Sequence, residues 1–135
     1  MDRSAVIDTL RDYFAGRRDV VAAYLFGSVA RGDARADSDV DVAVLLAAGE
    51  PADTAGYDAW FALQDDLEER LHQRVDLVAM NGAPLDLLHR VLRDGVRVVD
   101  NDPERRAEFE LQVRTQYLDF LPLLLRYRQR VLRGA

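Results

Sequence analysis

The sequence predicts an α/β (α+β) domain with a small mixed β-sheet, flanking helices and a long C-terminal helix. Two short apolar runs at residues 20–26 and 40–46 are typical of buried strands. Apolar residues at helical spacing stand before, between and after such runs, so helices and strands alternate. The 135 residues suffice for one domain with a core, and 49% apolar with 31% charged residues is a globular balance.

The first half of the chain opens with a helix and continues with the two strands. Ser4 precedes apolar residues at helical spacing and is the expected cap of a helix that stops near Gly16. Gly27-Ser28 breaks the first strand, and the polar residues 29–38 leave room for one helical turn before the second strand.

The third strand is expected after an amphipathic helix. Asp53 or Thr54 can cap that helix, which carries one apolar stripe opposite a face of acidic residues. Trp60 and Phe61 lie on the apolar stripe, so we expect both in the core. Residues 73–80 then alternate between apolar and polar positions as a strand does.

The last elements are two helices and a short strand between them. Pro84 suits the first turn of a helix that ends before Gly95, and residues 96–99 form an edge strand. A long helix follows over 103–133, with a kink expected at Pro122.

Composition excludes several kinds of site. Without cysteine the chain forms no disulfide and no thiolate metal site, and two histidines (His72 and His89) are too few for a His-rich one. All 18 basic residues are arginine, which excludes mechanisms that need a lysine. The longest apolar runs are far too short to span a bilayer, and no apolar signal segment follows Met1. We therefore expect a cytoplasmic protein with no membrane contact.

Charge is distributed unevenly along the chain. Residues 1–102 carry 11 Arg and 20 acidic side chains, whereas residues 103–135 carry 7 Arg and 4 acidic ones. We assign residues 1–102 to the main domain and residues 103–135 to a C-terminal helical extension of it. The extension has more apolar residues than one narrow stripe needs, so it is a candidate partner-docking element. The acidic body disfavours direct nucleic-acid binding.

The chemistry concentrates at the second strand. Asp39 and Asp41 are two residues apart, so their side chains point to the same face of that strand. Two adjacent carboxylates repel each other, and a divalent cation relieves that repulsion. Oxygen ligands of this kind suit Mg²⁺, which one or two carboxylates commonly hold together with substrate phosphates.

A phosphate-binding turn and a third acid complete the candidate site. Gly27 allows close backbone approach to a ligand, and the Ser28 hydroxyl adds a donor. Asp76 lies in the third strand, and it joins the pair if that strand is next to the second. Three acids at one site suit two-metal phosphoryl or nucleotidyl transfer, with Asp76 placed to help deprotonate an incoming hydroxyl.

These residues resemble a known family. Gly27-Ser28, ten intervening residues, and Asp39-Val40-Asp41 match the signature of the polymerase-beta nucleotidyltransferase superfamily. The string FGSVARGDARADSDVDVAV looks like its minimal nucleotidyltransferase (MNT) branch, and Asp76 falls where that family keeps its third carboxylate. The resemblance extends to MNT antitoxins, which pair with HEPN-domain toxins.

The resemblance implies a polymerase-beta-like nucleotidyltransferase fold, with residues 1–102 as the nucleotidyltransferase domain. It also implies a transfer of AMP from ATP to a tyrosine hydroxyl of the HEPN RNase toxin, which neutralises the toxin in a hetero-oligomer. The roles it implies are nucleotide binding by Gly27, Ser28, Arg31 and Ser38, and catalysis and Mg²⁺ binding by Asp39, Asp41 and Asp76.

Two alternatives remain open at this point. Nothing in the residues distinguishes a tyrosine from a small-molecule hydroxyl as acceptor, so the chain can also be an antibiotic-type nucleotidyltransferase. Such enzymes usually hold the acceptor with a second domain, for which this chain has only a terminal helix. The other alternative is a non-catalytic module that neutralises a toxin by binding alone. The intact set of three acids argues against it.

Overall fold

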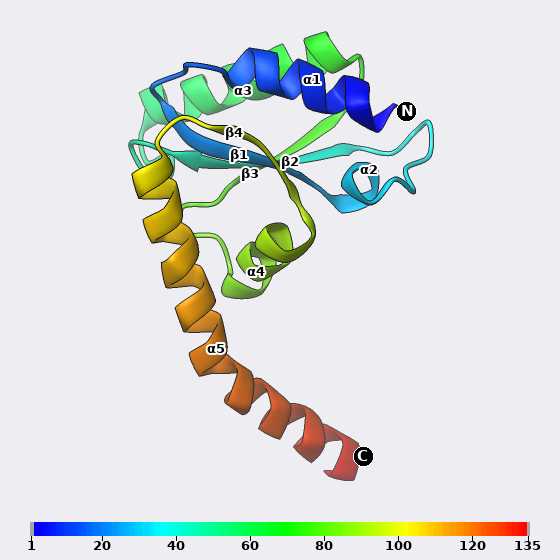
Figure 1. The fold of residues 1–135 in the computed structure, drawn as a ribbon, viewed down its shortest axis with the longest axis vertical. Helices are drawn as coiled ribbons and strands as arrows, with labels where there is room; N and C mark the ends of the chain where they lie inside the picture. The colour runs from blue at the N-terminus through cyan, green and yellow to red at the C-terminus, as the bar shows by residue number, and fades with distance from the viewer. Residues whose placement is uncertain (1, 135) are drawn as a thin grey trace.

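The sheet has four strands in the order β3-β2-β1-β4. A computed structural model describes residues 2–134, and in that range five helices and four strands follow one another (Figure 1). The mixed sheet, flanking helices and long C-terminal helix confirm the predicted fold class. The elements are α1 (Arg3–Phe14), β1 (Val20–Phe26), α2 (Gly27–Arg31), β2 (Val40–Leu46), α3 (Thr54–Leu71), β3 (Val75–Ala79), α4 (Leu85–Asp94), β4 (Val96–Asp100) and α5 (Pro103–Gly134).

Strand directions follow from the connections. β1 is antiparallel to both of its neighbours, β2 and β4. β2 and β3 are parallel because α3 carries the chain back across one face between them. This βαβ unit sets the starts of β2 and β3 side by side, and the end of β1 lies next to the start of β2.

Helices cover both faces of the sheet. α1 and α3 lie on one face, and α4 with the first part of α5 lies on the other (Figure 1). The core divides accordingly into two clusters, because alternate residues of β1 and β2 point to opposite faces. Val42 and Val44 face α1 and α3, whereas Ala43 and Leu45 face α4 and α5. Asp41 belongs by this alternation to the α4 side.

Two element starts differ from the sequence-based expectation. The cap of α1 is Asp2, whose side chain accepts a hydrogen bond from the Ser4 backbone N–H, so the helix begins one residue before Ser4. A carboxylate and a hydroxyl are both good caps, and the sequence alone does not separate them. α2 begins at Gly27 itself, directly after β1, rather than later in the polar segment.

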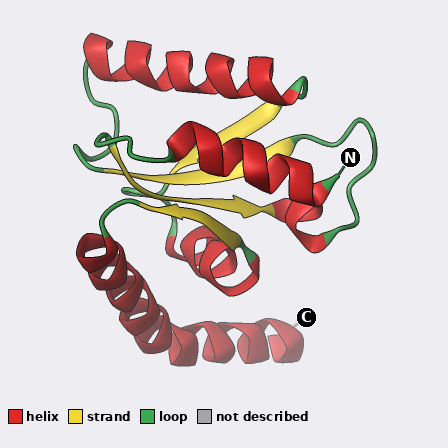
Figure 2. Cartoon of the chain, turned by 45° about the horizontal axis from the view of Figure 1, so that its top comes forward, coloured by secondary structure: helices red, strands yellow, loops and turns green. Residues whose placement is uncertain are grey.

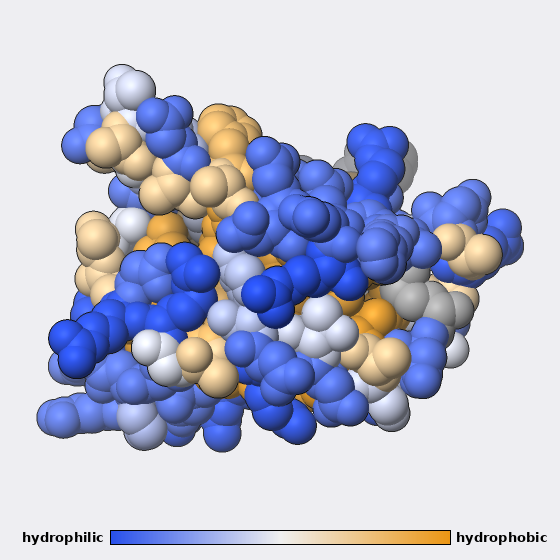
Figure 3. Space-filling view, turned by 90° about the horizontal axis from the view of Figure 1, so that it is seen from above, coloured by the Kyte–Doolittle hydropathy of each residue, from blue (hydrophilic) through white to orange (hydrophobic). Residues whose placement is uncertain are grey.

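Phe61 was expected in the core, and this prediction was wrong. Its side chain is 56% exposed and stacks on Tyr57, which is also exposed. The buried residues of α3 are Leu63 and Leu67. The face of the helix that packs against the sheet is therefore narrower than its number of apolar residues indicates. Seen from the side of α1 and α3, the surface is mostly hydrophilic with small apolar areas between (Figure 3).

A buried carboxylate fixes the root of α5. Glu110 is only 7% exposed and accepts hydrogen bonds from the Tyr24 hydroxyl of β1 and from Arg106, the latter at 3.2 Å. Arg114 and Arg97 lie at 3.5 and 3.9 Å from its carboxylate oxygens. Burial and the bond to Glu110 raise the pKa of Tyr24 above its usual range, so its hydroxyl stays protonated near neutrality.

Beyond this root, α5 extends away from the rest of the protein (Figure 1). Pro122 lies inside the helix, where it removes one backbone hydrogen bond, and Figure 2 shows that the helix bends along its length. Most side chains after Val113 are exposed, several large apolar ones among them. Within residues 2–134, no helix combines the length and apolar character that a membrane crossing needs.

Candidate active site

Three strand ends bring the predicted acidic residues together. Phe26, the last residue of β1, pairs with Asp41 of β2, and Asp41 pairs with Asp76 of β3 in the parallel register. Paired residues on adjacent strands point to the same face, so both carboxylates lie on the α4 side of the sheet. Asp39 precedes β2 by one residue and lies two residues from Asp41, so it shares that face. The condition for Asp76 to join the pair, a third strand next to the second, is therefore met.

Gly27 is the point where the backbone meets the Asp41 side chain. Its φ is +74°, a left-handed conformation that favours glycine, and it begins α2. A Cβ atom at this position would collide with the Asp41 carboxylate. Both the backbone conformation and the contact with Asp41 therefore require glycine at position 27. The turn that was expected to receive a phosphate also packs against a carboxylate.

The Asp41 carboxyl group is crowded by like charge. Burial, and after it the negative charges of Asp76 and Asp39, raise its pKa to about 6. Arg31 acts in the opposite direction but does not compensate. An ionised Asp41 is therefore unfavourable in the protein by itself, and a bound cation would remove the cause.

The donor set is suited to a hard cation. Asp41 is half-buried, whereas Asp39 and Asp76 are exposed, and all three offer only oxygen. Within residues 2–134, no group of three His, Asp or Glu side chains is arranged so that it could hold a metal ion by itself. Mg²⁺ does not require one, because it commonly takes one or two carboxylates and completes its shell with phosphate oxygens and water.

The remaining predicted residues lie around this edge of the sheet. Ser28 is the second residue of α2 and is half-buried, and its carbonyl accepts the Asp33 N–H at 3.1 Å. Arg31 is exposed and contacts Asp33 at 3.4 Å, close enough to Asp41 to act on its charge. Ser38 closes a turn: its hydroxyl accepts the Arg35 N–H at 2.9 Å. The side chain of Ser38 therefore braces the loop before β2.

The sequence pattern of one protein family covers this whole region. The family is described as polymerase beta, nucleotidyltransferase, and its pattern matches residues 8–104, which contain the site and all four strands. The chain belongs to this nucleotidyltransferase family. No curated protein matches the sequence.

Solved structures share the nucleotidyltransferase fold over the full chain. A toxin–antitoxin structure with AMP-PNP is 25% identical with a TM-score of 0.67, covering 99% of this chain and 98% of that one. The toxin–antitoxin MntA–HepT is 25% identical with a TM-score of 0.60, covering 98% and 95%. A tri-AMPylated HEPN toxin from Shewanella oneidensis in complex with MNT antitoxin matches at 25% identity and a TM-score of 0.61, covering 98% and 94%.

Two polar residues that the sequence reasoning missed hold β3 in place in the nucleotidyltransferase. Glu68 of α3 accepts the Val75 N–H at 3.0 Å, and Gln64 donates to the Val75 carbonyl at 2.9 Å. Val75 immediately precedes Asp76, so these bonds position the third carboxylate. Gln64 and Glu68 are four residues apart and lie on one side of the helix, and that spacing was the available signal.

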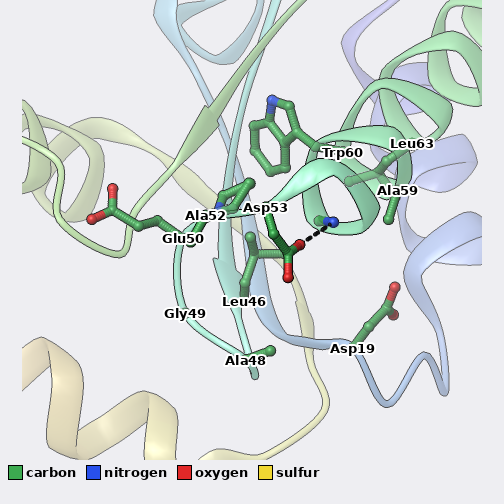
Figure 4. Close-up of a pocket in the computed structure, with 12 residues that line it drawn as sticks. Asp19, Leu46, Ala48, Gly49, Glu50, Ala52, Asp53, Ala59, Trp60 and Leu63 are labelled. Carbon is green, nitrogen blue, oxygen red and sulfur yellow. Dashed lines mark hydrogen bonds between the residues drawn. The ribbon is translucent and has the colours of Figure 1, made fainter.

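A cavity lies at the opposite end of β2 from the carboxylates of the nucleotidyltransferase. It has a volume of about 280 Å³ and is lined by Leu46, Trp60 and Leu63, with Asp19, Glu50 and Asp53 at its polar part (Figure 4). The Asp53 side chain is already used there, since it caps α3 by accepting the Gly56 N–H at 2.8 Å. Asp41 and Asp76 are not among the lining residues, so this cavity is separate from the carboxylate site.

Proposed function

We propose that this nucleotidyltransferase is the antitoxin of an MNT–HEPN pair and transfers AMP from ATP to a tyrosine hydroxyl of its partner toxin. The observation that carries the proposal is the register at the sheet edge, where Gly27 packs against Asp41 and Asp41 pairs with Asp76. This contact joins both halves of the family signature to a third acid in one place. It supports a working catalytic centre rather than a binding module.

Magnesium is the proposed cofactor. Asp39 and Asp41 would hold Mg²⁺ together with the nucleotide phosphates, and Asp76 would complete the site. When bound, the cation would neutralise phosphate charge and polarise the phosphorus that is attacked. The raised pKa of Asp41 supports this assignment, because it reports a partly buried carboxylate with two further acids beside it.

Different residues of the chain would bind the nucleotide, accept the proton and hold the loop in place during the transfer. The backbone at Gly27 and the Ser28 hydroxyl bind the triphosphate, and Arg31 lies where it can steady phosphate charge. Asp76 accepts the proton of the attacking hydroxyl. Ser38 holds the loop before β2 and so keeps Asp39 in position. The hydroxyl oxygen forms a bond to the α-phosphorus, and pyrophosphate leaves.

The partner would bring the acceptor to an open site. The carboxylates lie at an edge of the sheet, and α5 extends away from the body without covering them (Figure 1). The solved relatives are toxin–antitoxin structures, one with an AMPylated HEPN toxin, and they match this chain over almost its whole length. Both observations support a macromolecular acceptor over a small molecule.

We also propose residues 103–135 as the partner-docking element. One stripe of α5 runs from the buried Val113 past the half-buried Tyr117 and Leu124 to exposed side chains. Tyr127 and Val131 continue this stripe and are 66% and 49% exposed. An apolar stripe that starts in the core and continues without cover is typical of a protein-binding helix.

The test is a transfer assay with the neighbouring toxin. The chain is incubated with Mg²⁺ and α-labelled ATP, alone and with the HEPN protein encoded beside it. We expect label on a tyrosine of the toxin, lost in the double variant Asp39→Asn, Asp41→Asn and after metal chelation. Asp33→Asn is the matched control, because Asp33 is an exposed acid of the same loop region and should leave transfer intact.

The outcomes separate the three candidate functions. A stable complex without label would indicate a binding module. Absence of both complex and protein label would overturn the antitoxin proposal and direct the search to small acceptor hydroxyls. Label on the toxin that survives removal of both carboxylates would overturn the assignment of the site.

A further inference from the structure

α5 carries a second line of apolar side chains, separate from the stripe that we propose for docking the toxin. Leucines recur at every seventh residue of α5, and we call these four the leucine seam: Leu111, Leu118, Leu125 and Leu132. Their side chains are 67%, 65%, 48% and 81% exposed, so the seam has no cover within the described chain. A seven-residue apolar repeat keeps such residues on one line when two helices wind around each other.

The leucine seam is turned away from the side of α5 that packs on the sheet. Leu111 and the buried Val113 are about 200° apart around a helix that turns 100° per residue. Even at the root of α5, where Glu110 and Val113 pack on the sheet, the seam therefore faces solvent. Leu118 also borders a hollow that His89 and Leu92 of α4 line, and its side chain is still 65% exposed to a second helix.

We propose that two copies of this chain pair through the leucine seam, with their α5 helices antiparallel. A line that is complementary to itself fits a two-fold symmetric contact. The register that sets Leu118 against the partner's Leu125 also sets Leu111 against the partner's Leu132. This inference concerns assembly and holds whichever reaction the site performs.

Charge beside the seam selects the antiparallel direction. On one flank the first half of α5 has Arg105 followed by the acids Glu108 and Asp119, and the second half has Arg126 and Arg133. All five are exposed, and none makes an ion pair within residues 2–134. In antiparallel helices equivalent flanks face each other, so the leucine register brings Asp119 to the partner's Arg126 and Glu108 to the partner's Arg133. A parallel pair would set the arginines of both copies together.

Pro122 is compatible with this register. The midpoint between Leu118 and Leu125 falls at residue 121 or 122, so the two-fold axis passes beside the proline of each copy. Both helices then bend at the same level, and each straight half runs against the opposite half of the partner. The missing backbone hydrogen bond stays at the centre in both chains.

The first test measures the mass of the full chain without toxin or nucleotide. Sedimentation equilibrium over a wide concentration range should give a monomer–dimer equilibrium. The double variant Leu118→Glu, Leu125→Glu should weaken it by about 100-fold or more, because four carboxylates then meet at the contact. Leu123→Glu is the matched control: Leu123 is 60% exposed on the same helix but about 140° from Leu118, so the dimer should persist.

The second test determines the direction. The chain has no cysteine, so single cysteines introduced at chosen positions report unambiguously. A mixture of Glu108→Cys and Arg133→Cys chains should form the mixed disulfide, and Arg133→Cys alone should give little dimer. A monomer at all concentrations, or equal weakening by the control, would overturn the seam. Efficient self-linkage of Arg133→Cys would overturn the antiparallel arrangement.

Discussion

Gly27 and Asp41 depend on each other at the scale of single residues. The left-handed backbone at Gly27 turns the chain out of β1 into α2, and its missing side chain leaves the space that the Asp41 carboxylate occupies. The glycine of the family signature therefore also accommodates the Asp41 carboxylate. A side chain at residue 27 should disturb the carboxylate before any ligand binds.

Gly27→Ala should destabilise the protein by about 3 kcal/mol, from backbone strain at positive φ together with the collision with Asp41. Gly32→Ala is the matched control. Gly32 has a φ of +79° but open space around it, so only the strain of about 1 kcal/mol remains. Urea unfolding measures both variants, and equal losses would show that the collision is relieved cheaply.

Asp41→Asn should stabilise the free protein at pH 7.5 and have little effect at pH 4. The folded pKa of Asp41 is about 6, above its unfolded value of 3.8, so folding binds a proton between these values. The favourable contribution of Asp41 to the free energy of unfolding is complete below pH 3.8. It is lost as pH rises through 6, because the ionised carboxylate is unfavourable in the folded protein. The gain from asparagine at pH 7.5 should be about 1 kcal/mol after solvent screening.

The measurement is thermal unfolding of both proteins at several pH values without metal or nucleotide. Asp33→Asn serves as the comparison, since Asp33 is exposed and lies in an ion pair with Arg31. If the two substitutions show the same pH dependence, crowding of Asp41 by its neighbouring carboxylates is not the cause.

The sequence predicts the composition of the site but not its contacts. Strand alternation places Asp39 and Asp41 on one face, and a parallel third strand accounts for Asp76. The fit of Asp41 against Gly27 depends on the antiparallel register of β1 and β2, which no local pattern encodes. The exposure of Phe61 could not be predicted either, because helical spacing does not determine how wide a face of the helix the sheet covers.

At the scale of elements, the root of α5 is held by one buried carboxylate. Glu110 binds the Tyr24 hydroxyl of β1 and three arginines, and so it ties the helix to the centre of the sheet. The apolar pattern predicts a long helix but not this anchor, because a single acid in a charged helix resembles any solvated residue. The anchor determines the direction in which the free part of α5 leaves the body.

Glu110→Gln should destabilise the protein by about 3 kcal/mol, since three arginine side chains lose their shared partner. Glu69→Gln, an exposed helical glutamate, should change stability by less than about 0.5 kcal/mol. Hydrogen exchange should show the added opening in α5 and β1. A loss of protection spread evenly over the chain would contradict a local anchor.

The contact of α3 with β3 makes a second prediction at this scale. Glu68→Ala leaves the Val75 N–H without its partner and should cost about 1–2 kcal/mol. Because Asp76 comes next in the chain, transfer should also slow at saturating ATP. Glu68→Gln retains an acceptor oxygen and should restore both properties. Slow transfer in the glutamine variant would mean that Glu68 acts through its charge.

At the scale of the whole molecule, the site lies at the sheet edge and the free helix carries the uncovered apolar surface. This separation supports a division between chemistry in residues 1–102 and assembly in residues 103–135. Helix and strand order follow from the sequence, since apolar residues at helical or alternating spacing mark each element. How α5 leaves the body follows only from tertiary contacts such as Glu110.

Mg²⁺ and ATP together should raise the melting temperature of the wild-type chain, because they bind the folded state alone. Mg²⁺ alone or ATP alone should raise the melting temperature less, since the cation and the phosphates are expected to bind the carboxylates together. The effect should disappear in the double variant Asp39→Asn, Asp41→Asn and persist in Asp33→Asn. A full shift with ATP in the presence of a chelator would contradict shared binding.

The length of α5 changes how this protein moves through solution. A helix of 32 residues is about 48 Å long, and roughly half of it extends from the body of a 15.3 kDa chain. Friction with water rises with such elongation, so the monomer should elute from a sizing column ahead of a compact protein of equal mass. The elution volume of the monomer would thus resemble that of a compact dimer. Light scattering or sedimentation equilibrium, which measure molar mass independently of shape, are needed to determine the number of chains.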